Sequence, residues 1–69
     1  MSQIDALQAA LDRGEALTVA VALEYYGVYA LSQRMGELRR QGYPVERRMI
    51  ELPTGKRVAE YRRGAVAYG

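Results

Sequence analysis

The hydrophobic pattern of the chain has helical spacing over its first two thirds. A first helix is predicted between the N-cap candidate Ser2 and Gly14, because apolar residues recur there every three or four positions. A second helix is predicted from Val19 to about Tyr26, with Thr18 as its cap and Gly27 as its end. This segment is apolar nearly all round, so we expect it to pack against neighbours on more than one side.

A third helix is predicted from about Ala30 to Gln41, ended by Gly42 and Pro44. Its apolar residues fall within one arc of about 80°, which makes a stripe that faces the core. The stripe comprises Val28, Leu31, Met35 and Leu38. The opposite side carries Tyr29, Gln33, Gly36 and Arg40. Glycine inside a helix costs about 1 kcal/mol relative to alanine, so Gly36 is an unfavourable residue for this position.

After this helix the hydrophobic period becomes that of strands. Segments 45–52 and 56–63 flank Pro53-Thr54-Gly55, which predicts a two-stranded antiparallel hairpin. A type I turn with a glycine bulge gives one register, in which opposite charges face each other. The facing pairs are Leu52–Lys56, Glu51–Arg57, Ile50–Val58, Arg48–Glu60 and Glu46–Arg62. Each charged or β-branched pair contributes about 0.2–1 kcal/mol, and their coincidence supports this register.

Two groups of apolar residues compete for the inward face of the hairpin. At the strand tips, we expect the inward group to be Ile50, Leu52 and Val58. The competing group comprises Val45, Met49, Ala59 and Tyr61, and of these we expect Tyr61 to be partly buried near the base. Residues 1–63 are thus expected to form one domain. Residues 64–69 have no evident partner strand and are expected to form a flexible tail.

The size and composition of the chain are those of one small globular domain. Its 69 residues, 49% hydrophobic and 26% charged, bury only about 60% of the surface exposed by the unfolded chain, which leaves a thin stability margin. No segment approaches the roughly 20 apolar residues of a membrane span, and the first residues lack the pattern of a signal peptide. We therefore expect a cytoplasmic protein without a membrane partner.

The residue inventory argues against catalysis. There is no cysteine or histidine, so disulfides and thiolate metal sites are excluded, and the commonest catalytic base and zinc ligand are missing. The Gly55-Lys56 pair lacks the earlier glycine and following Ser or Thr of a phosphate-binding loop. We expect neither an enzyme nor a bound metal or cofactor.

Charge is distributed unevenly along the chain. Residues 1–33 hold one arginine against four acidic residues, whereas residues 34–69 hold nine Arg or Lys against four glutamates. The halves therefore carry net charges of −3 and +5, although the whole chain has only +2. Such a domain has a preferred side for an anionic partner.

The predicted order of elements, three helices followed by a hairpin, is that of an α+β winged helix-turn-helix. The segment 17–62 also resembles short winged helix-turn-helix proteins that are common in phages and prophages. The matching motifs are Leu17-Thr18, Ala22-Leu23, Tyr26-Gly27-Val28, Glu37-Leu38-Arg39, Gly42-Tyr43-Pro44-Val45 and Gly55 to Arg62. The resemblance implies duplex DNA binding, with the third helix in the major groove and the hairpin, or wing, against the flanking backbone.

The residues that would contact DNA follow from this arrangement. The amide of Gln33 suits adenine, an arginine fork suits guanine or phosphate, and the wing cations suit the backbone. Arg39 and Arg40 also complement the dipole at the end of the helix. The expected contacts are Tyr29, Ser32, Gln33, Arg34, Arg39, Arg40, Arg47, Lys56 and Arg57. After cross-strand pairs are discounted, the free cations are Arg34, Arg39, Arg40, Arg47, Lys56 and Arg63, few enough to suggest a homodimer.

The functional hypothesis is therefore a phage-type protein that regulates transcription, excision or replication by binding DNA. The alternative is a protein-interaction module on the same fold, for example one that binds and inhibits a host protein. Low net charge, Glu37 on the exposed face, Gly36 and the tyrosines near positions 25–29 favour this alternative. A third hypothesis is an RNA-binding winged helix, which would prefer structured RNA to duplex DNA.

Overall fold

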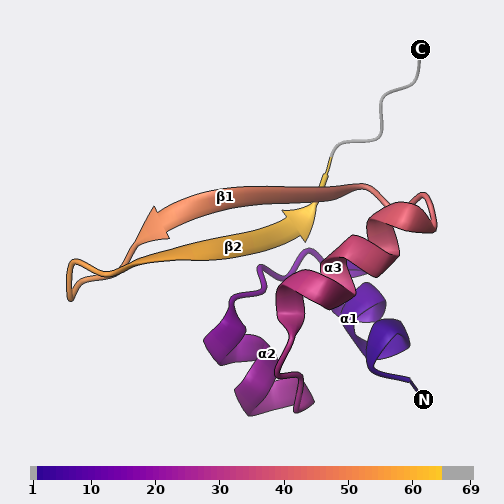
Figure 1. Cartoon of the computed structure of the whole chain (residues 1–69), viewed down its shortest axis with the longest axis horizontal. Coiled ribbons are helices and arrows are strands. Elements are labelled where there is room, and N and C mark those ends of the chain that lie inside the picture. The colour runs from indigo at the N-terminus through magenta and orange to yellow at the C-terminus, as the bar shows by residue number, and fades with distance from the viewer. Residues whose placement is uncertain (1, 65–69) are drawn as a thin grey trace.

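The computed structural model describes residues 2–64, in which three helices are followed by a two-stranded antiparallel hairpin (Figure 1). The elements are α1 (Gln3–Asp12), α2 (Val19–Tyr26), α3 (Leu31–Arg40), β1 (Val45–Glu51) and β2 (Arg57–Arg63). The predicted fold class and element order are thus confirmed. The N–H of Gly64 donates to the carbonyl of Pro44 at 2.9 Å, which closes the base of the hairpin. The rest of the predicted tail, residues 65–69, lies outside the described residues.

Short local signals start and end the helices. The side chain of Ser2 accepts a hydrogen bond from the N–H three residues later at 3.2 Å, and Thr18 does the same for α2 at 3.3 Å. Gly27, with φ of 66°, ends α2 in the left-handed region that favours glycine. By contrast, α3 starts at Ala30 without a side-chain cap, so its position depends on packing rather than on its own first turn.

The core is formed by one face of each helix and the base of the hairpin. The buried apolar residues are Leu7, Ala10, Leu11, Leu17, Ala22, Val28, Leu31, Met35, Leu38 and Tyr61. The predicted apolar stripe of α3 is therefore confirmed. Leu17 and Tyr61 exchange two backbone hydrogen bonds, of 2.8 and 2.7 Å, and so join the loop before α2 to β2. This bridge fixes the hairpin to the helical layer.

The strand register agrees with the predicted one at every pair from Glu46–Arg62 to Glu51–Arg57. The turn also closes as expected, since the N–H of Leu52 donates to the carbonyl of Lys56 at 2.8 Å. Within residues 2–64, only one of the three facing charge pairs forms an ion pair, Arg48–Glu60 at 3.9 Å. Glu60 lies closer to Arg62, at 2.8 Å on its own strand, so register and ion pairing are set separately.

The prediction for the inward face of the hairpin is confirmed only in part. Val45 and Ala59 pack against the core and Tyr61 is 4% exposed, whereas Ile50 and Val58 are only partly buried and Leu52 is exposed. Figure 1 shows the reason, because the turn and the strand ends beside it extend past the helices, whereas the rest of the hairpin lies over them. The apolar residues near the turn are consequently covered only in part, by the first residues of α2.

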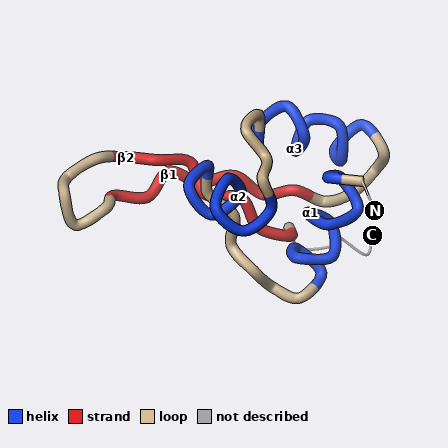
Figure 2. Tube along the Cα trace, turned by 90° about the horizontal axis from the view of Figure 1, so that it is seen from below, coloured by secondary structure: helices blue, strands red, loops and turns tan. Residues whose placement is uncertain are grey.

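The expected burial of α2 is wrong. Its one fully buried residue is Ala22, while Val19 and Leu23 remain 55% and 42% exposed. α2 lies below the hairpin in Figure 1 and in front of it in Figure 2, with one side turned to the core. An apolar helix therefore presents most of its surface to solvent. Exposed apolar surface of this kind usually marks a site of interaction with another molecule.

Tyr43 links the loop after α3 to the end of α1, because its hydroxyl donates to Asp12 Oδ1 at 2.6 Å. Burial, together with this carboxylate, raises the pKa of Tyr43 from 10.0 to about 12. The folded state thus holds the proton more tightly than the unfolded chain, so the contribution of this group to stability is complete below pH 10.0 and is lost as the pH rises through about 12.

We expect Tyr43→Phe to be less stable than the wild type at neutral pH, by about 1 kcal/mol for the lost hydrogen bond. That difference should shrink as the pH approaches the raised pKa, because the wild type then loses the same contact. Urea unfolding of both proteins at neutral and strongly alkaline pH measures it. A difference that does not change with pH would contradict the assigned contact.

Candidate nucleic-acid interface

The outer face of α3 is open to solvent. Leu31, Met35 and Leu38 are buried, and the helix geometry therefore turns Ser32 and Gln33 outward, where both are exposed. In both views α3 and the tip of the hairpin lie at opposite ends of the long axis, so the hairpin tip does not cover this face (Figures 1 and 2). A long polyanion could contact both places at once.

The first part of this face is polar and uncharged. Tyr29, in the loop before α3, is 82% exposed, and Ser32 follows it at a spacing of three residues. Gln33 is the next outward side chain, and its amide can donate to and accept from an adenine edge in the major groove. These three predicted site residues are grouped at the start of α3.

Arg34 was predicted to be a free cation, and this prediction is wrong. Its Nη1 lies 2.6 Å from Oε1 of Glu37, and the two side chains are 34% and 29% exposed. Residues three apart on a helix lie side by side, which allows this pair to form within α3 itself. The prediction failed because it discounted only cross-strand pairs and ignored pairs within the helix.

The Arg34–Glu37 pair predicts that Glu37→Gln will strengthen DNA binding. The substitution removes a negative charge from the outer face and frees Arg34 for a phosphate, which would steepen the slope of log affinity against log salt by about 0.9. Titration of a fluorescent duplex at several salt concentrations measures both effects. An unchanged slope would show that Arg34 does not reach the DNA, and Glu24→Gln on α2 provides a control for the change in net charge.

The end of α3 carries two exposed arginines with different surroundings. Nη2 of Arg39 donates to the carbonyl of Val45 at 3.3 Å, so this side chain is turned toward β1. The guanidinium of Arg40 lies back along the helix, with Nη1 3.8 Å from where a Cβ of Gly36 would stand. Arg40 is thus the more available of the two on the outer face.

The remaining predicted contacts lie on the hairpin and are exposed. Nη2 of Arg47 is 3.7 Å from Sδ of Met49, a weak contact that leaves its charge unpaired within the described part of the chain. Lys56 and Arg57 stand at the tip, where Figure 1 shows the hairpin extending past the helices. The candidate residues therefore fall into two places, the outer face of α3 with the adjoining part of β1, and the hairpin tip.

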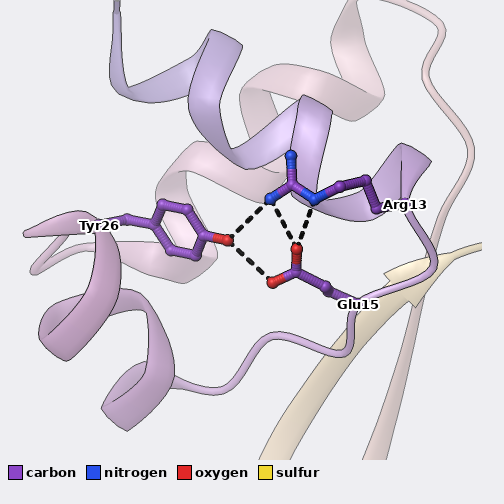
Figure 3. Close-up of polar contacts among 3 residues, drawn as sticks. All are labelled: Arg13, Glu15 and Tyr26. Carbon is purple, nitrogen blue, oxygen red and sulfur yellow. Dashed lines mark hydrogen bonds and ion pairs between the residues drawn. The ribbon is translucent and has the colours of Figure 1, made fainter.

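Tyr26 belongs to a polar network that the sequence did not reveal (Figure 3). Its hydroxyl donates to Oε1 of Glu15 at 2.8 Å and accepts from Nη2 of Arg13 at 3.2 Å, while Nε of Arg13 donates to Oε2 of Glu15 at 2.8 Å. The hydrogen bonds from Tyr26 and Arg13 lower the pKa of Glu15, and the contact with Glu15 raises the pKa of Tyr26. The network joins the end of α2 to the loop after α1, so Tyr26 has a structural role.

An apolar groove of about 510 Å³ runs between the start of α2 and the distal half of the hairpin. It is lined by Thr18, Val19, Ala20, Leu52, Lys56 and Val58. The sequence did not predict it, because α2 was expected to be covered and the apolar residues of the hairpin were expected to point into the core. The groove is the second candidate site of the molecule.

A family model described as a winged helix-turn-helix domain matches residues 2–63 of the chain. Comparisons with curated proteins and with solved structures gave no match. Helix-turn-helix domains characteristically bind DNA by placing their second motif helix, here α3, in the major groove. Within residues 2–64, no helix has the length and apolar character needed to cross a bilayer.

Proposed function

Because the chain belongs to the winged helix-turn-helix domain family, we propose that it binds duplex DNA with α3 in the major groove and the hairpin along the flanking backbone. One observation carries this proposal. The helix that is buried along Leu31, Met35 and Leu38 leaves an outer face of polar and cationic side chains uncovered. The tip of the hairpin, which is far from α3 along the chain, adds cations at the other end of the molecule.

Each group of residues has a distinct task in this proposal. Gln33, Ser32 and Tyr29 read base edges at the start of α3. Arg39, Arg40 and Arg47 hold phosphates near its end, and Lys56 and Arg57 hold the backbone at the hairpin tip. The protein would recognise DNA without catalysing a reaction, as a phage- or prophage-type regulator of transcription, excision or replication in the cytoplasm of a bacterial host.

The proposed complex is a homodimer on DNA. Within residues 2–64, one copy has six cations outside ion pairs, and five of them are predicted DNA contacts. Each phosphate contact contributes a slope of only about −0.9 to the salt dependence. A second copy doubles the contacts and fits the two-fold symmetry of many operators. The exposed apolar residues of α2 and the groove beside them are the surface that favours pairing.

Titration of the purified protein against random-sequence duplex DNA tests the proposal. Log affinity should fall linearly with log salt, with a slope of about −4 to −5 per bound copy if all five cations meet phosphates. DNA binding would be refuted if no binding is detected at low salt, or if the measured affinity does not change with salt concentration. A competing structured RNA that displaces the duplex would instead favour the RNA-binding hypothesis.

A second candidate function is docking of another protein, and the apolar groove is the observation that favours it. Val19 and Leu52 border the groove and are exposed, although large apolar side chains rarely gather on the surface of a monomer without a partner. Sedimentation of the protein alone and with duplex DNA separates the cases. A stable dimer with DNA bound supports the first proposal, whereas a monomer that ignores DNA supports docking of a different protein.

A further inference from the structure

Gly36 is the one glycine of the helices, and nothing in the described part of the chain requires it. Four other glycines have positive φ values, between 66° and 89°, which side chains rarely adopt, but Gly36 is not among them. A Cβ added at Gly36 would meet only Nη1 of Arg40, at 3.8 Å, an ordinary van der Waals contact at the end of a flexible side chain. Alanine would therefore fit, and would favour the helix.

The surroundings of Gly36 lie on the outer face of α3. Residues three and four positions away are its neighbours on the helix surface, which are Ser32 and Gln33 on one side and Arg39 and Arg40 on the other. All four are exposed. The missing side chain consequently leaves a gap between hydrogen-bonding and cationic groups, not within an apolar patch. The free protein covers this gap with the guanidinium of Arg40.

The dimensions of a helix and of DNA indicate what such a gap could accept. An α-helix with its side chains is about 10–12 Å across, and the major groove is about 12 Å wide, so an inserted helix fills the groove. One absent side chain on the inserted face lets the backbone lie closer to the base pairs. Glycine is the residue that commonly permits such close approach of backbone to ligand.

We propose that Gly36 is the point at which duplex DNA approaches α3 most closely, with the edge of a base pair in the gap and Arg40 moved from the gap onto the DNA. The inference rests on the proposed function and specifies which part of α3 lies nearest to the base pairs in the major groove. A residue that weakens its own helix, without any need from the fold, is typical of a position selected for binding. Gly36 is thereby a residue that sets the depth of insertion, and Arg40 is the cation beside it.

The experiment compares Gly36→Ala and Gly36→Gln with the wild type, using a duplex selected from a random-sequence pool by the wild-type protein. Gly36→Ala should melt about 4–8 °C higher, because it removes the cost of glycine in a helix. The same variant should bind the duplex about tenfold more weakly, and Gly36→Gln more weakly still, since a larger side chain keeps the helix further from the bases. Stability and affinity would thus change in opposite directions.

Gln3→Ala, at an exposed position of α1, is the matched control and should leave affinity unchanged. If Gly36→Ala binds as tightly as the wild type while Arg40→Gln binds more weakly, the inference is overturned and DNA binding stands. A lower melting temperature for Gly36→Ala would also overturn it, because the fold would then require the glycine. If the wild type itself shows no salt-dependent binding to any duplex, the proposed function fails and the inference with it.

Discussion

Replacement of Arg40 by glutamine is expected to weaken duplex DNA binding by about 10–100-fold. The guanidinium lies on the outer face of α3 and forms no ion pair within residues 2–64, so it is available to a phosphate or base. A hydrogen bond to a charged group contributes about 1.5–3 kcal/mol, and each 1.4 kcal/mol is a factor of ten in affinity. The slope of log affinity against log salt should also become about 0.9 less steep if the partner is a phosphate.

Arg13→Gln is the matched control for this prediction, because it removes the same charge from the loop after α1 instead of from α3. Arg13 is exposed and already paired with Glu15, so its loss should change affinity by less than about twofold through the general field alone. Fluorescence anisotropy titrations of both variants at one low and one moderate salt concentration measure the difference. Equal effects of the two substitutions would show that only net charge matters and that α3 does not contact DNA.

Replacement of Tyr61 by alanine is expected to unfold the domain or to leave it barely stable. Tyr61 is 4% exposed, packs in the core and pairs through its backbone with Leu17. Aromatic-to-alanine changes in cores cost about 3–5 kcal/mol, and at about 0.05–0.15 kcal/mol per residue a 69-residue chain has about 3–10 kcal/mol in all. The loss is therefore comparable to the whole stability of the protein.

Tyr25→Ala provides the comparison within the same residue type. Tyr25 is 71% exposed, and a surface substitution of this kind normally changes stability by no more than about 0.5 kcal/mol. Urea unfolding followed by circular dichroism gives both values. A Tyr61→Ala protein that unfolds with the midpoint of the wild type would mean that the hairpin base does not contribute to the core. In that case the position of the hairpin would have to be set by other contacts.

The two predictions concern separate parts of the molecule, which makes them informative together. Arg40 lies on the surface, so Arg40→Gln should change DNA binding and leave the melting temperature near that of the wild type. The side chain of Tyr61 is buried in the core and should affect binding only through folding. If Arg40→Gln changes only DNA binding and Tyr61→Ala acts only through stability, α3 has an apolar face toward the core and an opposite face that contacts DNA.

Local rules were enough to place the elements. Capping by Ser2 and Thr18 and the termination of α2 at Gly27 each depend on a few neighbouring residues, so the helix bounds could be predicted closely. The hairpin register was also predictable, because the turn at residues 53–55 fixes which residues face each other. The buried stripe of α3 followed from its period, and the exposure of Gln33 and Arg40 followed from the stripe.

Apart from Arg34, whose partner Glu37 lies within its own helix, the features that were predicted wrongly or only in part depend on where elements lie relative to one another. Val19 and Leu23 are as apolar as the core residues, and only the placement of α2 leaves them exposed. The inward face of the hairpin depends on how far it extends past the helices, which no strand pattern encodes. The network of Tyr26, Arg13 and Glu15 joins residues 11 to 13 positions apart that neither periodicity nor register relates.

The sequence by itself determined the elements, their order, the strand register and the side of α3 that meets the core, because these depend on interactions between residues that are close along the chain or paired by one turn. Only the tertiary structure decided that Tyr61 rather than Ile50 anchors the hairpin, and that α2 and the hairpin border an apolar groove. Those outcomes depend on the space left after all elements are packed together, which is a property of the whole molecule.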